Sequence, residues 1–513
     1  MEQPLRDITL REKGKRFAVS GIIEKIVQTG GPTLFMIRDH TGALTIKAFD
    51  GAGVRAYPQL TEGMGIRGTV KINEYEGELE GEAIKLSPMS AEESKQFKER
   101  VDQEQRKEAR PKPIEFLAKS QILDKLKERF IQAATEIRLA IIKGRPIIVR
   151  HHNDCDGYSA GYALERAILP LIRKYHKEVK APWEHYNRAP CAAPFYEIED
   201  SIKDISRALS NVAKFSEVMP LIIIVDNGSS QEDLLGIKQG KVHGAEFIVV
   251  DHHFFEKDVI SSEVLVHINP FLVGEDGTHF SAGMLCSEFS RFINEETDTS
   301  HIPALAGLAD RIKNPSVMET YLKLAEKHGY DESMLKDIGA LIDYVSAKVR
   351  FMEAREYIEV VFGEPIAKQK ALIALMAPHL KKQEETSLKI AQLAATREVH
   401  GKVTLQLIYV EQSFSRGVYP KPGRATGNLH DYAATHDKID RLVTTGILSD
   451  AITMRATEHS GFSVHDLIDY LKKGVPDAFV EGGGHHHAGA IKFVPSKQAD
   501  VLAAIRNFVG KIK

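Results

Sequence analysis

The sequence predicts an α/β protein made of several domains, and three observations lead to this prediction. The chain has 513 residues, which is too many for one ordinary hydrophobic core. Short aliphatic runs such as Leu221–Val225 alternate with helical patterns, which is typical of a parallel sheet covered on both faces. Ahead of them, short alternating strands separated by Gly-rich turns predict a small β-barrel.

Composition narrows the class of protein. Lys and Arg total 68 against 71 Asp and Glu, and the net charge of −3 excludes a protein held on DNA by bulk charge. The three cysteines, Cys155, Cys191 and Cys286, show neither a disulfide framework nor zinc-site spacing, which favours a reducing, cytoplasmic setting. The N-terminal stretch lacks the apolar core of a signal peptide, and no aliphatic run exceeds strand length. We therefore expect no membrane partner.

Residues 1–90 are expected to form the barrel. Apolar and polar side chains alternate along residues 43–49, and the order of strands and turns resembles an OB-fold. The outward face then carries Lys47 and Phe49, a cation beside an aromatic ring, which suits the binding of a single strand. The alternative is a solvated sheet face with a structural Phe. Three nearby glutamates oppose nucleic-acid binding: Glu76, Glu78 and Glu80.

Four further segments follow the barrel. Residues 91–120 contain a run of charges without apolar periodicity and are expected to form a partly helical linker. Residues 121–313 alternate aliphatic runs with helices and predict the parallel-sheet domain. Residues 314–398 predict a helical insert with an amphipathic stripe. Residues 399–513 return to alternating strands and helices, which indicates a smaller second α/β domain.

Acidic and imidazole side chains gather after three of the aliphatic runs. They are His152, Asp154 and Asp156 after the first run, Asp226 after the second, and Asp251, His252 and His253 after the third. Ligands of open α/β sheets bind beyond the carboxyl ends of the strands, so these turns are expected side by side. Carboxylates this crowded repel one another unless cations neutralise them, and oxygen ligands with some imidazole suit Mn²⁺ or Mg²⁺ better than Zn²⁺. A pair of ions bridged by one carboxylate would suit in-line attack on a phosphoester.

At these residues the chain resembles the DHH phosphoesterase superfamily, and within it the RecJ-like nucleases. The first motif of the family is matched by residues 152–157, the second by Asp226, and the third, Asp-His-His, by residues 251–253. A fourth aspartate, which ends the stretch ALAGLAD, is Asp310.

The resemblance extends to the C-terminal segment. The stretch EGGGHHHAGA from Glu481 resembles the signature of the companion DHHA1 domain, and Arg455 matches an arginine that follows a strand there. The resemblance covers about residues 145–493. Together with the OB-like barrel and the helical insert, it looks most like archaeal RecJ-type proteins, with a DHH domain followed by a smaller DHHA1 domain.

The resemblance implies a role for each matched residue. His152 and Asp154 would hold one Mn²⁺ ion, with Mg²⁺ as the alternative, and Asp226 would bridge it to a second ion. The second ion would also be held by Asp156, His252 and Asp310. Asp251 would orient its neighbours and His253 would contact the scissile phosphate. His151 is an adjacent candidate for the first ion, but the register of the family motif favours His152.

The glycine-rich signature has a direct physical interpretation. The turn Gly482, Gly483 and Gly484 would let the backbone approach a phosphate and offer N–H donors, while His485 adds an imidazole beside the metals. A basic loop nearby, which includes Arg416, either follows a nucleic-acid backbone or is a solvated loop.

The leading hypothesis is a metal-dependent exonuclease that hydrolyses phosphodiester bonds of single-stranded DNA or RNA by a two-metal mechanism. One alternative is a small-molecule phosphodiesterase that cleaves oligonucleotides or cyclic dinucleotides, for which a strand-binding barrel would be superfluous. Another is an inactive replication scaffold. Every acidic position of the motifs is present, which argues against this alternative. The resemblance also implies replication or repair proteins as partners.

Overall fold

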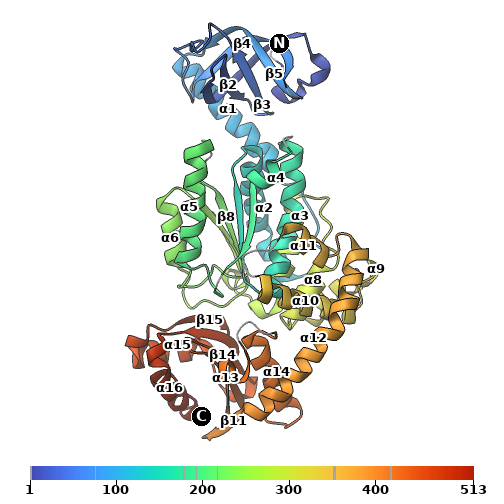
Figure 1. The fold of residues 1–513 in the computed structure, drawn as a ribbon, viewed down its shortest axis with the longest axis vertical. Helices are drawn as coiled ribbons and strands as arrows, with labels where there is room; N and C mark the ends of the chain where they lie inside the picture. The colour runs from blue at the N-terminus through green and yellow to red at the C-terminus, as the bar shows by residue number, and fades with distance from the viewer. Residues whose placement is uncertain are drawn as a thin grey trace.

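The computed structural model describes residues 3–75, 77–176, 179–191, 193–215, 218–349, 354–415 and 419–512. Its three domains follow one another along the long axis, with the N-terminal barrel at one end and the C-terminal domain at the other (Figure 1). Within these residues, every helix is too short or too polar to cross a membrane.

The N-terminal domain is a closed five-stranded barrel in the order β1-β2-β3-β5-β4, as the sequence predicts. Its strands are β1 (Arg16–Gln28), β2 (Thr33–Arg38), β3 (Ala43–Ala48), β4 (Gly65–Tyr75) and β5 (Glu78–Pro88). Pairing of β1 with β4 closes the barrel. Leu44 and Ile46 are buried inside it, which confirms the alternation predicted for residues 43–49.

The charged segment after the barrel forms one helix, α1 (Ala91–Ala109). Ser90 begins it with a capping box, in which the Ser90 side chain accepts from the Glu93 backbone and the Glu93 side chain accepts from the Ser90 backbone. Phe97 and Val101, one helical turn apart, are buried against the barrel. This short apolar contact holds the helix to the barrel, and α2 (Gln121–Ile142) then enters the central domain.

The central domain is a parallel sheet in the order β10-β9-β8-β6-β7. Its strands are β6 (Ile147–His151), β7 (Tyr186–Pro190), β8 (Leu221–Val225), β9 (Glu246–Val250) and β10 (Val266–Ile268). One face packs on α2, α3 (Cys155–Tyr175) and α7 (Ala282–Ile293), and the other on α5 (Ile198–Phe215) and α6 (Leu234–Val242) (Figure 1). Both faces are therefore covered, which explains why these strands are continuously aliphatic. The short helices α4 (Ala181–Glu184) and α8 (Ile302–Ala309) complete the domain.

The segment after α8 is helical, as predicted. It contains α9 (Pro315–Lys327), α10 (Glu332–Val349), α11 (Arg355–Val361) and α12 (Ile366–Ala394). Ile338, Leu341 and Ile342 of α10 are buried in the same core as the central domain. The long helix α12 then leads down to the C-terminal domain (Figure 1).

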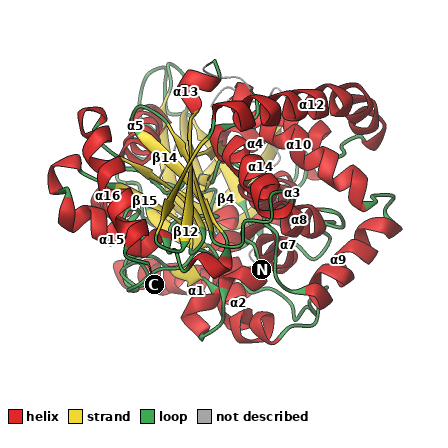
Figure 2. Cartoon of the chain, turned by 90° about the horizontal axis from the view of Figure 1, so that it is seen from below, coloured by secondary structure: helices red, strands yellow, loops and turns green. Residues whose placement is uncertain are grey.

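The C-terminal domain is a mixed sheet in the order β11-β12-β13-β14-β16-β15. Its strands are β11 (Thr396–His400), β12 (Val403–Tyr409), β13 (Leu442–Ile447), β14 (Ala451–Ala456), β15 (Glu481–His485) and β16 (Ala488–Lys492). Helices α15 (Val464–Gly474) and α16 (Gln498–Gly510) pack on one face, and α14 (Pro422–Thr435) with the end of α12 on the other (Figure 2). The short helix α13 (Val410–Ser413) follows β12.

Candidate metal centre

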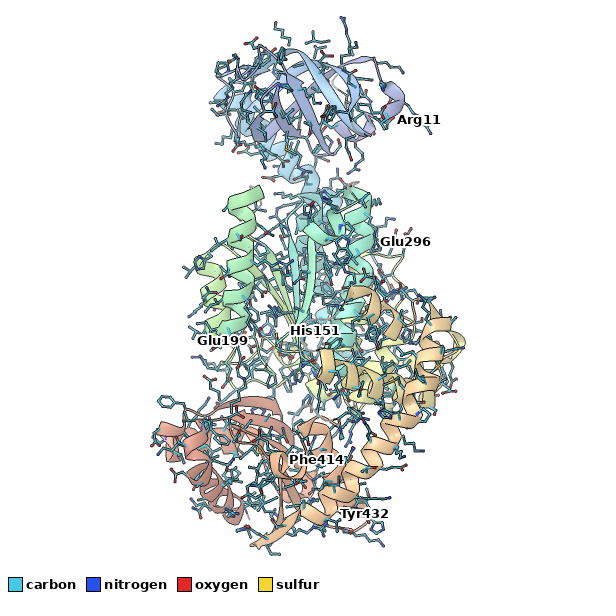
Figure 3. All side chains as sticks on the ribbon, viewed as in Figure 1. Arg11, His151, Glu199, Glu296, Phe414 and Tyr432 are labelled. Carbon is cyan, nitrogen blue, oxygen red and sulfur yellow. The ribbon has the colours of Figure 1, made fainter. Side chains whose placement is uncertain are left out.

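The three predicted strand ends lie next to one another. Strands β6, β8 and β9 are neighbours in the sheet, and their carboxyl ends face the C-terminal domain. Figure 3 labels His151, the last residue of β6, at this edge. The acidic and imidazole side chains that follow the three strands therefore meet in the interface between the two domains.

Asp226 lies at the centre of this cluster. It follows β8 with φ of 60°, and its backbone N–H donates to the carbonyl of Val250 at 3.0 Å. Its Oδ1 is 3.4 Å from Nε2 of His252, and its Oδ2 is 3.5 Å from Nδ1 of His152. The side chain is buried, yet Oδ2 accepts no hydrogen bond from the described residues. Both oxygens therefore face the space where a cation would bind.

His152 and Asp154 adjoin Asp226 on one side. Nδ1 of His152 is 2.9 Å from Oδ2 of Asp154. The other oxygen of Asp154 caps α3 by accepting from the backbone of Gly157 at 2.9 Å, so helix formation itself aims Oδ2 at the cluster. Burial opposes the charged imidazole, but Asp154 and Asp226 beside it raise the pKa of His152 well above its usual value.

Asp156, His252 and Asp310 adjoin Asp226 on the other side. The carboxylate of Asp156 accepts from the backbone N–H groups of Ala282 at 2.8 Å and Gly283 at 3.0 Å, at the start of α7. Nε2 of His252 is 3.8 Å from Oδ2 of Asp156 and 3.6 Å from Oδ2 of Asp310. Burial, and then the like charges of Asp226 and Asp310, raise the pKa of Asp156 well above its usual value, a repulsion that a cation would relieve.

Asp251 and His253 occupy the edge of the cluster. Oδ1 of Asp251 accepts from the backbone N–H of His252 and from Nδ1 of His253, both at 2.8 Å. Asp251 therefore fixes the backbone of His252 and orients the imidazole of His253. The ring of His253 stacks on the ring of His485, with centroids 4.7 Å apart. Nε2 of His485 is 3.5 Å from Oδ1 of Asp310, so the C-terminal domain contributes an imidazole to the cluster.

These residues fit a pair of divalent cations. Among the described residues, four overlapping groups have ligand atoms within 4.8 Å of one another, and Asp226 belongs to three of them. The donors are carboxylate oxygens and imidazole nitrogens, the set that suits Mn²⁺ or Mg²⁺. The carboxylate of Asp226 has one oxygen toward each side of the cluster, and Oδ2 accepts no hydrogen bond from the described residues.

Comparisons with known proteins identify the family. Residues 146–308 match the model of the DHH family, N-terminal domain. The chain is 34% identical, over 525 aligned positions, to the uncharacterised protein MJ1198 of Methanocaldococcus jannaschii, covering 96% of this chain and 69% of that protein. The chain belongs to the DHH family.

Solved structures agree with this assignment. The DHH domain of PF0399, described as a member of a family of ribosomal proteins, is 36% identical to this chain. It aligns with a TM-score of 0.77 over 82% of this chain and 99% of its own. RecJ of Thermus thermophilus in complex with Mn²⁺ shares the fold at 16% identity, with a TM-score of 0.52 over 79% of this chain and 57% of RecJ.

The glycine run of this DHH protein lies in a strand and not in the predicted turn. Gly482, Gly483 and Gly484 belong to β15, which pairs only with β16 and is the edge of its sheet; the turn is formed by His486 and His487. A Cβ on Gly482 or Gly484 would lie 2.5–2.6 Å from backbone oxygens of β16, whereas a Cβ on Gly483 would meet nothing within 4 Å. Two of the glycines are therefore required for close pairing, and the third leaves open space.

Arg455, on β14, lines a cavity of about 470 Å³ that adjoins the metal centre. His152, Asp154 and Asp310 line the same cavity. The guanidinium of Arg455 forms no ion pair within the part of the chain that the structure describes. It is therefore a free cation directed at a space beside the carboxylates.

The other predicted contact residues lie elsewhere. Lys47 and Phe49 are on the barrel, at the far end of the molecule from the DHH motifs (Figure 1). Nζ of Lys47 is 2.5 Å from Oε2 of Glu80 and 3.7 Å above the ring of Tyr75, so this cation is already engaged. The side chain of Phe49 is 67% exposed.

Arg416 lies outside the described residues, but the basic residues after it turn inward. Nζ of Lys421 donates to the carbonyl of Asn153 at 2.6 Å, within the first motif, and Arg424 pairs with Asp343 and Glu384. Phe414 packs in the core of its own domain. The basic run in the sequence thus marks a contact between the two domains near the metal centre.

His151 points away from the metal centre. Its ring is fully buried and lies edge-on against Tyr158 at 4.6 Å. Burial, and then the neighbouring Arg188 guanidinium, hold the pKa of His151 well below its usual value. Sequence reasoning missed Arg188, because only the pairing of β7 with β6 brings it to this place.

Proposed function

We propose that this protein is a metal-dependent phosphodiesterase that acts on single-stranded nucleic acid from an end. The observation that carries the proposal is Asp226, a buried carboxylate shared by three potential ligand groups, with one oxygen that accepts no hydrogen bond from the described residues. Four carboxylates converge here, and a cation would relieve the part of their mutual repulsion that the neighbouring imidazoles do not offset. Membership of the DHH family supports hydrolysis of a phosphoester.

Different residues of the site would hold different metal ions. His152 and Asp154 would hold one ion, Asp156, His252 and Asp310 the other, and Asp226 both. Two such ions supply activation of water and stabilisation of charge on the transferred phosphoryl group. Asp251 keeps His252 and His253 in place through three hydrogen bonds, from the two backbone N–H groups and from Nδ1 of His253.

The C-terminal domain would hold the substrate phosphate from the side opposite the ions. His485 already reaches the cluster through Asp310, and Arg455 offers a guanidinium without an anionic partner among the described residues. The edge strand β15 leaves backbone N–H groups that no neighbouring strand uses, and Gly483 leaves open space there. A phosphate gripped in this way stays aligned with the attacking water.

A polymeric substrate is favoured by the barrel. Its closed five-stranded topology is that of an OB-fold, and Phe49 is an exposed aromatic ring on which a base can stack. A smaller substrate is favoured by a different observation: the cavity of about 470 Å³ beside the ions has the size of a nucleotide or dinucleotide site. The two candidates differ in whether the barrel contributes to turnover.

One experiment tests the proposal. The full-length protein is incubated with end-labelled single-stranded DNA, single-stranded RNA, duplex DNA and a dinucleotide, each with Mn²⁺, with Mg²⁺ and with EDTA. We expect release of mononucleotides from the single strands, no release with EDTA, and little release from the duplex. Turnover of the dinucleotide alone would establish the small-molecule candidate. Absence of hydrolysis of every substrate, by a folded protein that binds Mn²⁺, would overturn the proposal.

A further inference from the structure

His151 and Arg188 form a buried chain of hydrogen bonds that ends on a proposed metal ligand. Nδ1 of His151 is 2.7 Å from the backbone oxygen of His152. Nε2 of the same ring is 3.1 Å from Nη1 of Arg188, and Nε of Arg188 donates to Oε2 of Glu165 at 3.1 Å. His151, Arg188 and Glu165 are almost fully buried, so water does not compete with these bonds.

The guanidinium of Arg188 and the carbonyl of His152 together determine the tautomer of the His151 imidazole. A guanidinium only donates hydrogen bonds, so Nε2 of His151 must accept from Arg188. A carbonyl oxygen only accepts, so Nδ1 must carry the proton that it shares with His152. Both contacts require the same neutral tautomer, and the carboxylate of Glu165 holds Arg188 in the position that imposes it.

The backbone of His152 is held on several sides at this point. Its N–H donates to the carbonyl of Val225 at 3.3 Å, immediately before Asp226. The start of α3 packs so closely that a Cβ on Gly157 would lie 2.2 Å from the His152 oxygen. The hydrogen bond from His151 completes this set, and any rotation of the His152 peptide would swing its imidazole away from Asp154 and Asp226.

We propose that Arg188 and His151 are positioning residues, which hold the backbone of His152 so that its imidazole meets the first metal ion. The inference rests on the proposed role of His152 as a metal ligand. Groups that orient metal ligands in this way change metal affinity by about 10–100-fold when they are removed. His151 is thus the neighbour of a ligand and not a substitute for one.

The test compares two substitutions of His151 in the full-length protein by calorimetric titration with Mn²⁺. His151→Leu removes the donor to the His152 carbonyl. His151→Asn keeps a donor, because Nδ2 of asparagine occupies the place of Nδ1. We expect His151→Leu to weaken one of two Mn²⁺ sites by about tenfold or more and to leave the other site unchanged, with His151→Asn closer to the native protein.

Gln369→Leu is the matched control. Nε2 of Gln369 is also a buried donor to a backbone carbonyl, that of Val361 at 2.7 Å, but it belongs to the helical insert. Its loss should lower the melting temperature and leave both Mn²⁺ affinities native. If His151→Leu does not fold, the double variant Arg188→Gln/Glu165→Gln replaces it. This variant removes both buried charges together, so that the imidazole of His151 is no longer held in one tautomer. The same loss of Mn²⁺ affinity at one site is expected.

Two native Mn²⁺ affinities in a folded His151→Leu protein, or an equal loss at both sites in every variant, would overturn the inference. The measurement is binding, so it separates this inference from the proposed function. If the protein binds two ions but hydrolyses none of the substrates, the proposed function is contradicted, and the positioning role can still be tested by the same titrations.

Discussion

Nε2 of His485 lies 3.5 Å from Oδ1 of Asp310, and this contact joins the two domains at the metal centre. Asp310 ends α8 of the DHH domain, and His485 ends β15 of the C-terminal domain. The other oxygen of Asp310 faces His252 at 3.6 Å, so one carboxylate lies between an imidazole from each domain. The site is therefore complete only when the domains are together.

Replacing His485 should separate catalysis from metal binding. We expect His485→Ala to lower kcat by about 100-fold or more, because an imidazole near the developing negative charge acts mainly in the transition state. Mn²⁺ affinity should change little, since the proposed ligands remain. Single-turnover rates and calorimetry on the same samples measure both quantities. His486→Ala, in the adjacent turn, is the control, and a matching loss there would mean that the turn as a whole had been disturbed.

Asp226→Asn should abolish hydrolysis and weaken the binding of both ions. An amide offers one neutral oxygen where the proposed bridge needs two charged ones. Circular dichroism verifies the fold, and calorimetry counts the ions. Glu288→Gln changes another buried carboxylate, whose partners are two backbone N–H groups, Tyr321 and Arg291, and should leave metal binding native. Two tightly bound ions in Asp226→Asn would rule out the bridging role.

Metal removal should destabilise the folded protein. Cations that bind only the native state raise the free energy of unfolding of the protein. Here they would also relieve the repulsion among the converging carboxylates. At Mn²⁺ concentrations of about 100 times Kd, the expected gain is about 2.7 kcal/mol per site. Thermal unfolding with Mn²⁺ and with EDTA measures the difference. The shift should be much smaller in Asp226→Asn, and an equal shift in both proteins would place the stabilising ions elsewhere.

Gly483→Val should impair substrate binding without loss of metal. A Cβ on Gly483 meets nothing within 4 Å, so the fold accepts a side chain there. In the proposed phosphate grip, the valine side chain would displace the phosphate. We expect a higher KM and a lower kcat, each by about tenfold, with unchanged Mn²⁺ affinity. Gly474→Val is the matched control, because a Cβ there also meets nothing within 4 Å. Loss of metal from Gly483→Val would show that β15 shapes the metal site itself.

Phe49→Ala should matter only for long substrates. Stacking of one base on an aromatic ring contributes about 1–3 kcal/mol, so the apparent affinity for a strand of about 30 nucleotides should fall by about 5-fold to 150-fold. Turnover of a dinucleotide should stay native, because the barrel lies at the other end of the molecule. Ile84→Ala, a second exposed apolar residue on the barrel, is the control. Equal affinity of Phe49→Ala and the native protein for the long strand would leave the barrel without a stacking role at this residue.

Much of the fold followed from local pattern. Alternation along residues 43–49 indicated the barrel, and aliphatic runs such as Leu221–Val225 indicated strands buried on both faces, because side-chain direction in a strand repeats every two residues. The short stripe of Phe97 and Val101 in α1 was missed, since two apolar residues among many charges make a weak helical signal.

The residues that follow the three strands could be predicted from the sequence to gather at one place, because parallel strands bring their carboxyl ends to one edge of the sheet. The contacts that each of these side chains makes depend on strand register and on domain docking. Strand register turns His151 toward Arg188 and leaves His152 with Asp226, although the two histidines are adjacent in the chain. Docking of the domains brings His485 to Asp310, and the parallel pairing of β3 with β5 brings Lys47 to Glu80. These contacts join residues far apart in the sequence, and no local pattern encodes the distance between them.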